Sequence, residues 1–176
     1  SDLAILISTL SNTKCREFQQ FGVEILDSSD IKSDIEILEL IITLLRAVGV
    51  EEDSIKIRIN DVALFNKLVE YCHISANDII SLKKNLDYLA ECYAGKHPED
   101  YLRTQDSIRG IITKYSISEE YQKVWDVIIN HSYNSISEVI SLYPNTFKQE
   151  FLFLQRILSH FKGTNSKIEL DLSVIR

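Results

Sequence analysis

An amide and a carboxylate lie four residues apart in an extended segment near the start of the chain. In residues 16–26 apolar side chains alternate, which is typical of a β-strand whose successive side chains point to opposite faces. Gln20 and Glu24 then share one face with Gly22 between them, and the four residues of strand span roughly 13 Å. Two polar groups at this spacing can bind opposite ends of a small polar ligand, for which glycine leaves room. The same pattern also suits an edge strand with one solvated face.

The composition is that of a globular protein, and it argues against some classes of function. The 176 residues are 45% hydrophobic and 26% charged, which is enough for one domain with a core or a small domain with an appendage. The net charge of -7 argues against a strongly electrostatic nucleic-acid binder, because phosphate binding needs clustered Lys and Arg. No apolar run reaches the length of a membrane span, so we expect no membrane partner. Cys15, Cys72 and Cys92 lie in no metal-ligand spacing and suggest reduced thiols in a cytosolic protein.

The first part of the chain mixes strands with helices. Residues 3–7 predict a short buried strand that forms an antiparallel hairpin with residues 16–26. Ser33 begins a capping box, which predicts that a helix starts there. Residues 55–59 alternate like a half-buried strand, and Asp61 is placed to cap the helix that follows. This order predicts an α+β fold, with helices beside a mixed or antiparallel sheet.

The pattern becomes helical from about residue 74 onward. Ser75 and Ser137 are candidate N-caps, and no strand pattern interrupts residues 74–164. Residues 167–174 then alternate again, with the charged side chains on one face. We therefore divide the chain into a partial core (1–73), an all-helical insertion domain (74–164) and a return strand of the core (165–176).

Segments at both ends of the chain resemble histidyl-tRNA synthetases. Residues 16–25 read REFQQFGVEI and resemble the second half of the class II signature known as motif 2. Residues 57–60 read IRIN and resemble a segment that follows it. Residues 170–176 read LDLSVIR and resemble the strand that leads into the family's Arg-Gly-Leu-Asp-Tyr-Tyr motif, up to its arginine. The helical stretch lies where this family has its insertion domain, so the resemblance implies a class II synthetase-like sheet with flanking helices.

The resemblance implies roles for individual residues. Gln20 and Glu24 match residues of the histidine pocket, where the carboxylate pairs with the substrate α-ammonium. Arg176 matches a catalytic arginine near the substrate carboxylate and the α-phosphate, where its cation stabilises charge that develops during adenylate formation. Arg16 is expected to be structural, through an ion pair. Lys14 can supply one weak ATP contact from the loop, although it lacks the bidentate fork of arginine.

The implied parent protein is a cytoplasmic homodimer that activates L-histidine with ATP and magnesium and transfers it to tRNA. The family's motif 2 begins with an arginine that binds the ATP phosphate. Residues 3–13, which would hold the start of this motif, contain no arginine. Motifs 1 and 3 are also absent. We therefore expect a partial or divergent catalytic domain that is inactive by itself.

Two other readings stay open. The synthetase-like regulatory subunit of ATP phosphoribosyltransferase resembles the same core and uses a histidine pocket as a feedback sensor. The missing arginine favours this sensor, whereas residues 57–60 and the helical insertion favour the synthetase. A third reading is the degenerate synthetase-like domain of a stress-response kinase, against which Gln20 and Glu24 argue.

The helical insertion gives little sign of an RNA-binding face. Its Lys and Arg residues are offset by a similar number of acids, and Lys83 with Lys84 suits a solvated helix face. A tRNA contact through this stretch therefore rests on the resemblance. The histidines are expected at helix ends or on polar faces without partners at ligand spacing, so we expect no metal or catalytic role for His73, His97, His131 and His160.

Overall fold

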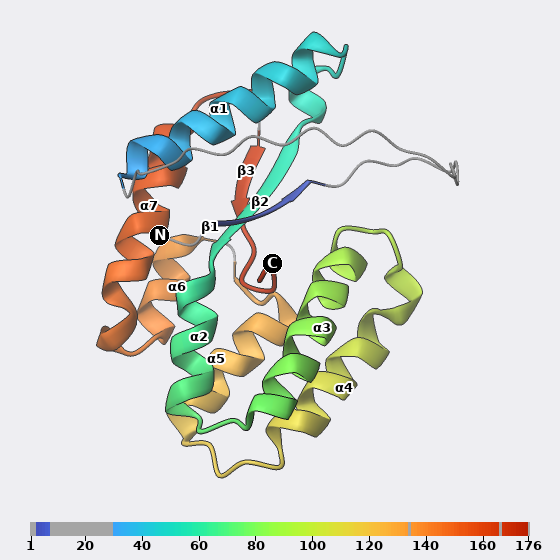
Figure 1. Ribbon diagram of the computed structural model, residues 1–176, viewed down its shortest axis with the longest axis vertical. Helices are drawn as coiled ribbons and strands as arrows, with labels where there is room; N and C mark the ends of the chain where they lie inside the picture. Colours follow the sequence, from blue (N-terminus) through green and yellow to red (C-terminus); the bar gives the residue numbers. More distant parts are fainter. Residues whose placement is uncertain (1–2, 8–29, 134, 166, 176) are drawn as a thin grey trace.

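The protein has a mixed α+β fold in which a small sheet is surrounded by helices (Figure 1). The computed structural model describes residues 3–7, 30–133, 135–165 and 167–175. Within these ranges the elements, in chain order, are β1 (Leu3–Ile7), α1 (Ile31–Ala47), β2 (Lys56–Asp61), α2 (Val62–Tyr71), α3 (Ala76–Tyr93), α4 (Tyr101–Ile112), α5 (Glu119–Asn130), α6 (Ile136–Leu142), α7 (Lys148–His160) and β3 (Lys167–Leu170). The predicted α+β class is confirmed.

The sheet is mixed, with β2 at its centre. β1 pairs with β2 in the antiparallel direction, so that Ile5 lies opposite Ile59. β3 pairs with the other edge of β2 in the parallel direction, so that Ile57 lies opposite Ile168. A parallel neighbour requires a long crossover, and α2 to α7 form this crossover between β2 and β3. The predicted hairpin cannot be assessed, because residues 16–26 lie outside the described residues.

The strand predicted at residues 55–59 is confirmed as β2, but the prediction that it is half-buried is wrong. In β2 every residue from Ile57 to Asp61 is buried, including Arg58, which is 8% exposed, and Asn60, which is 1% exposed. The reason is the position of β2, since it has strand neighbours on both edges, contacts α7, and has consecutive buried residues that point to both faces of the sheet. Alternation of residue types in sequence does not reveal a second covered face.

Two predicted helix caps are confirmed. The Asp61 carboxylate accepts a hydrogen bond of 2.9 Å from the Ala63 N–H at the start of α2. The Ser75 hydroxyl accepts one of 3.3 Å from the Asp78 N–H at the start of α3. Each side chain satisfies one of the backbone donors that a helix N-terminus leaves without an intrahelical partner.

Two other helix starts were predicted a few residues too late. α1 begins after Asp30, whose carboxylate accepts a hydrogen bond from the Lys32 N–H, and not after Ser33. α6 begins after Ser135 and not at Ser137. In both places two polar residues lie within one turn, and local sequence does not decide which of them caps the helix.

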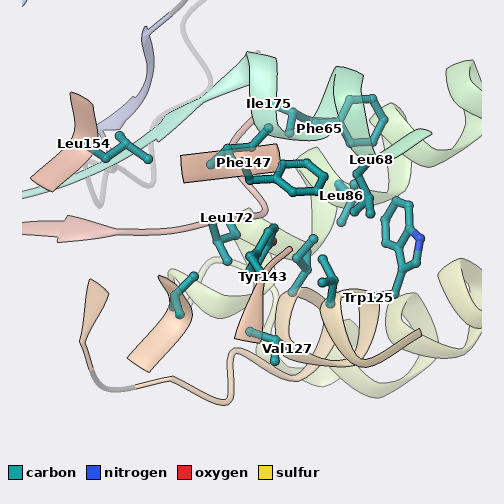
Figure 2. Close-up of a cluster of buried hydrophobic side chains, with 14 of the residues drawn as sticks. Phe65, Leu68, Leu86, Trp125, Val127, Tyr143, Phe147, Leu154, Leu172 and Ile175 are labelled. Atoms are coloured by element: carbon teal, nitrogen blue, oxygen red, sulfur yellow. The ribbon is translucent and has the colours of Figure 1, made fainter. Parts of the chain in front are cut away.

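The core is a large cluster of buried apolar side chains contributed by β2, the helices and the segment after β3 (Figure 2). Phe65 of α2 meets Trp125 of α5 edge to face, with ring centroids 6.4 Å apart. Leu172 and Ile175 belong to the same cluster, beyond the end of β3. The cluster thus joins all three predicted parts of the chain, and their division into domains stays a prediction.

The strand predicted to run through residue 174 ends earlier, at Leu170. Residues 171–175, which we call the 171–175 turn, bend back with a hydrogen bond of 3.1 Å from the Val174 N–H to the Asp171 carbonyl. All five residues are buried, including Asp171 and Ser173, which were expected on a polar face. In Figure 1 the turn leaves the tip of β3 and enters the middle of the molecule.

We predict that Asp61→Ala lowers the free energy of unfolding by about 1 to 2 kcal/mol, because the first turn of α2 loses its buried cap. Asp61→Asn keeps an oxygen acceptor and is expected to retain most of the stability. Urea unfolding followed by circular dichroism measures both variants. Equal losses in the two variants would contradict the assigned capping role.

Candidate functional site

All five residues that the sequence assigned to motif 2 or to the catalytic arginine lie outside the described residues. These are Lys14, Arg16, Gln20, Glu24 and Arg176. Their predicted roles therefore stay predictions. Two other segments of the family resemblance, residues 57–60 and 170–175, are described and lie in contact with each other.

Asn60 joins β2 to the 171–175 turn. Its side-chain amide donates hydrogen bonds to the carbonyls of Leu172, at 3.2 Å, and Val174, at 3.1 Å. All three residues are buried, so water does not compete for these carbonyls. The side-chain amide of Asn60 therefore binds two carbonyls of the 171–175 turn that are two residues apart, and this turn precedes Arg176 in the sequence.

Asp171 places a carboxylate in the interior of the protein. Its Oδ1 accepts hydrogen bonds from the Ser173 N–H, at 3.0 Å, from the Ser173 hydroxyl, at 2.5 Å, and from His131 Nε2, at 3.2 Å. The guanidinium Nε of Arg58 lies 3.9 Å from Oδ2, which is an ion-pair distance and too long for a hydrogen bond. A buried carboxylate is stable only when such donors and charges replace its hydration.

The ring of His131 connects this carboxylate to two helices. His131 follows the last residue of α5, and its Nδ1 lies 3.0 Å from the hydroxyl of Tyr101 on α4. Tyr93, the last residue of α3, stacks on the imidazole with centroids 3.8 Å apart and planes 12° apart. The Arg58 guanidinium lies 4.8 Å from the centroid of the same tyrosine ring, which is a cation–π distance.

The hydrogen-bond pattern decides what this cluster can do chemically. A carboxylate only accepts hydrogen bonds, so Nε2 of His131 carries a proton and Nδ1 can accept from Tyr101. The Ser173 hydroxyl donates to Asp171 and faces the same protonated nitrogen. The imidazole therefore cannot accept the proton of Ser173, so the set lacks the serine-to-histidine hydrogen bond of a Ser–His–Asp triad and is assigned as a structural network.

The network changes the pKa values of two buried groups. Burial alone would raise the pKa of Asp171, but its interactions with His131 and the two hydrogen bonds from Ser173 outweigh burial and hold the pKa below 3.8. Burial raises the pKa of Tyr133 well above 10, and the charge of Asp171 adds to this rise. The neutral Tyr133 hydroxyl accepts a hydrogen bond of 3.0 Å from the Leu172 N–H, so it is a further contact to the turn.

A cavity of about 460 Å³ lies beside the network, on the side of β3. Its wall includes the rings of Tyr93 and Tyr133 and the Lys56–Glu169 ion pair, whose charged atoms are 3.3 Å apart. This volume is in the range of small-molecule sites. A second cavity, of about 320 Å³, is lined by Arg109 and residues of α5 and shares no residue with the network.

The sequence did not identify His131 as a residue with partners. Its expected position at a helix end is correct, but its partners Asp171 and Ser173 are 40 and 42 residues away along the chain. The only available signal was that both partners lie in the segment that resembles the family. Among the described residues, no group of three or more His, Cys, Asp or Glu side chains is arranged to hold a metal ion. No helix in this part of the chain is long and apolar enough to cross a bilayer.

Comparison with known proteins agrees with the resemblance. A family model described as histidyl-tRNA synthetase matches residues 7–172. Histidine–tRNA ligases of Saccharolobus islandicus and Saccharolobus shibatae are 26% identical over 163 residues, which cover 92% of this chain and 36% of theirs. The Saccharolobus solfataricus ligase is 26% identical over 170 residues, with the same coverage. The chain thus spans about a third of the length of these relatives. No solved structure matches the chain significantly.

We predict that Asp171 stabilises the fold in a pH-dependent way. Because its pKa is lower in the folded state than the ordinary value of 3.8, its contribution is present above pH 3.8 and is lost as the pH falls through the folded value. Asp171→Asn should lower the free energy of unfolding by about 2 to 3 kcal/mol at pH 6, where a charged acceptor is removed. The difference from wild type should shrink below pH 3.8.

Urea unfolding between pH 3 and pH 6 measures this difference. Asp126→Asn is the control, because it removes an exposed carboxylate of α5. A loss for Asp171→Asn that is constant over this pH range would contradict the assigned ionised state of Asp171.

Proposed function

The chain belongs to the histidyl-tRNA synthetase family, and from this premise we propose that the protein containing it activates L-histidine with ATP and transfers it to tRNA. In this proposal the chain is a partial or divergent catalytic domain of the class II type. Its sheet and flanking helices belong to the synthetase core, and α3 to α7 lie in the insertion that follows β2.

The observation that carries the proposal is the contact between β2 and the 171–175 turn. Two segments that resemble the family, 110 or more residues apart in sequence, meet through buried hydrogen bonds from Asn60 to the turn. The turn directly precedes Arg176, which matches the family's catalytic arginine. A buried framework behind that position supports a role for Arg176 that requires a fixed orientation, as charge stabilisation during catalysis does.

The proposed reaction assigns a step to each residue of the resemblance. Glu24 pairs with the α-ammonium of histidine and Gln20 binds the other end of the substrate. The substrate carboxylate attacks the α-phosphate of ATP, and pyrophosphate leaves. Arg176 stabilises the negative charge at the α-phosphate in the transition state, and Lys14 contributes one weak ATP contact. ATP is expected to arrive as its magnesium complex.

The remaining partners follow from the same proposal. The ribose hydroxyl at the end of tRNA attacks the carbonyl of the histidyl adenylate, so that the histidyl group forms an ester with tRNA and AMP leaves, with the helical region of residues 74–164 as the proposed RNA contact. A homodimer in the cytoplasm is the proposed form of the parent protein. These features rest on the family and on no contact described above.

The absence of arginine in residues 3–13 favours one alternative, a histidine-sensing regulatory subunit of ATP phosphoribosyltransferase. Such a protein binds histidine and does not form the adenylate. Pyrophosphate exchange by the full protein, in the presence of histidine, separates the two functions. Exchange above background selects the synthetase, whereas histidine binding without exchange selects the regulator.

We predict that Glu24→Ala abolishes histidine binding by the full protein. Loss of the carboxylate leaves the substrate ammonium without its partner, which costs about 2 to 5 kcal/mol, on the order of a hundredfold or more in affinity. Isothermal titration calorimetry with L-histidine measures the effect. Glu120→Ala, which removes an exposed carboxylate in the first turn of α5, is the control and should bind like wild type. Unchanged binding by Glu24→Ala would rule out the pocket assignment.

A further inference from the structure

His131 has a backbone conformation that its residue type disfavours. Its φ of 48° and ψ of 38° lie in the left-handed region, where a β-carbon is crowded. Glycines occupy the corresponding left-handed positions after α1, α3 and α7, at Gly49, Gly95 and Gly163. A non-glycine residue held in this region costs of order 1–3 kcal/mol and persists only where surrounding contacts compensate.

The His131 backbone N–H bonds the Ile128 carbonyl at 3.4 Å, and the other contacts come from the side chain. The imidazole bonds the Tyr101 hydroxyl through one nitrogen and the Asp171 carboxylate through the other, and it stacks on Tyr93. The ring is fully enclosed, with 1% of the side chain exposed. His131 therefore connects three helices to the 171–175 turn.

The turn depends on this connection for its shape. Four successive backbone amides, those of residues 171 to 174, donate hydrogen bonds to Ile59, Tyr133 and Asp171. Asp171 accepts two of these four hydrogen bonds, one at its backbone carbonyl and one at its side-chain carboxylate. The Nε2 proton of His131 is the donor to that carboxylate from outside the turn, so it fixes the group around which the turn folds.

We infer that His131 is a positioning residue, which holds the 171–175 turn in one conformation, and that adenylate formation depends on this turn because Arg176 follows it directly in the sequence. The inference rests on the proposed function for its catalytic part and on the hydrogen-bond network for its structural part. It connects the helical region, through the end of α5, to the segment that carries the catalytic arginine. His131 itself touches no substrate, because the ring is enclosed by Asp171, Tyr93 and Tyr101.

The chain offers a matched control for the backbone of His131. His73 follows α2 and has a similar left-handed φ of 52°, but its side chain is exposed. His73→Gly and His131→Gly remove the same type of backbone crowding, and only His131→Gly removes the network donor. His131→Gln is the conservative variant, because its side-chain amide presents an N–H donor at about the distance of Nε2.

The activity test uses pyrophosphate exchange by the full protein. For His131→Gly we expect kcat to fall by about tenfold to a hundredfold while KM for histidine changes less than about threefold, because a misplaced Arg176 affects mainly the transition state. His131→Gln should recover most of kcat, and His73→Gly should match wild type. A loss that appears equally in His73→Gly, or no loss in His131→Gly, overturns the inference.

Hydrogen exchange measured by mass spectrometry tests the structural part without reference to activity. Peptides covering residues 170–176 should exchange at least about tenfold faster in His131→Gly than in wild type, with no change in His73→Gly. Unchanged exchange overturns the inference whether or not the wild type is active. Faster exchange in a protein whose wild type makes no adenylate would overturn the proposed function, and with it the catalytic part of the inference.

Discussion

The buried carboxylate of Asp171 is the constraint on which the arrangement of this site depends. A negative charge removed from water is stable only if donors and positive charge replace its hydration. Ser173 supplies two donors by bending the chain back, and His131 supplies a third from the end of α5. Arg58 adds a positive charge at 3.9 Å. These requirements explain why β3 ends at Leu170, and the histidine that helps to meet them is the left-handed residue after α5.

The position of β2 at the centre of the sheet creates the second set of contacts. Arg58 and Asn60 would be solvated on an edge strand, but here they are buried and lie in contact with other polar and aromatic groups of the protein. Asn60 satisfies two carbonyls of the turn, and Arg58 lies between a carboxylate and an aromatic ring. The polar residues of the strand and His131 therefore both contact the 171–175 turn.

The residues whose contacts the structure describes differ from the residues that the proposed function assigns to substrate binding and catalysis. The described residues supply the framework, which consists of the buried strand β2, a hydrogen-bond network around Asp171 and aromatic walls beside a cavity. The residues that match the family's substrate contacts, Gln20, Glu24 and Arg176, lie outside the described residues, and their roles belong to the proposed function. The proposed synthetase chemistry requires both the framework and the substrate-contacting residues, because a group stabilises a transition state only when its orientation is fixed.

Local features of the fold and its family relationship were predictable from sequence. The α+β class, the central strand at residues 56–61 and the caps at Asp61 and Ser75 follow from patterns within a few residues. The family could be recognised from short segments at both ends of the chain, and the match of the family model over residues 7–172 agrees. The exact starts of α1 and α6 were missed, because neighbouring polar residues offer equivalent caps.

The sequence by itself thus determined the class of fold, several element boundaries and the family, because each depends on residues close together in the chain. The tertiary structure alone decided which polar residues are buried and what they bond. Arg58 and Asp171 alternate with apolar neighbours just as solvent-facing residues do, and nothing around His131 indicates a partner 40 residues away. These contacts form only when α5, β2 and the 171–175 turn pack together, since burial and long-range pairing are properties of the packed chain and not of its local pattern.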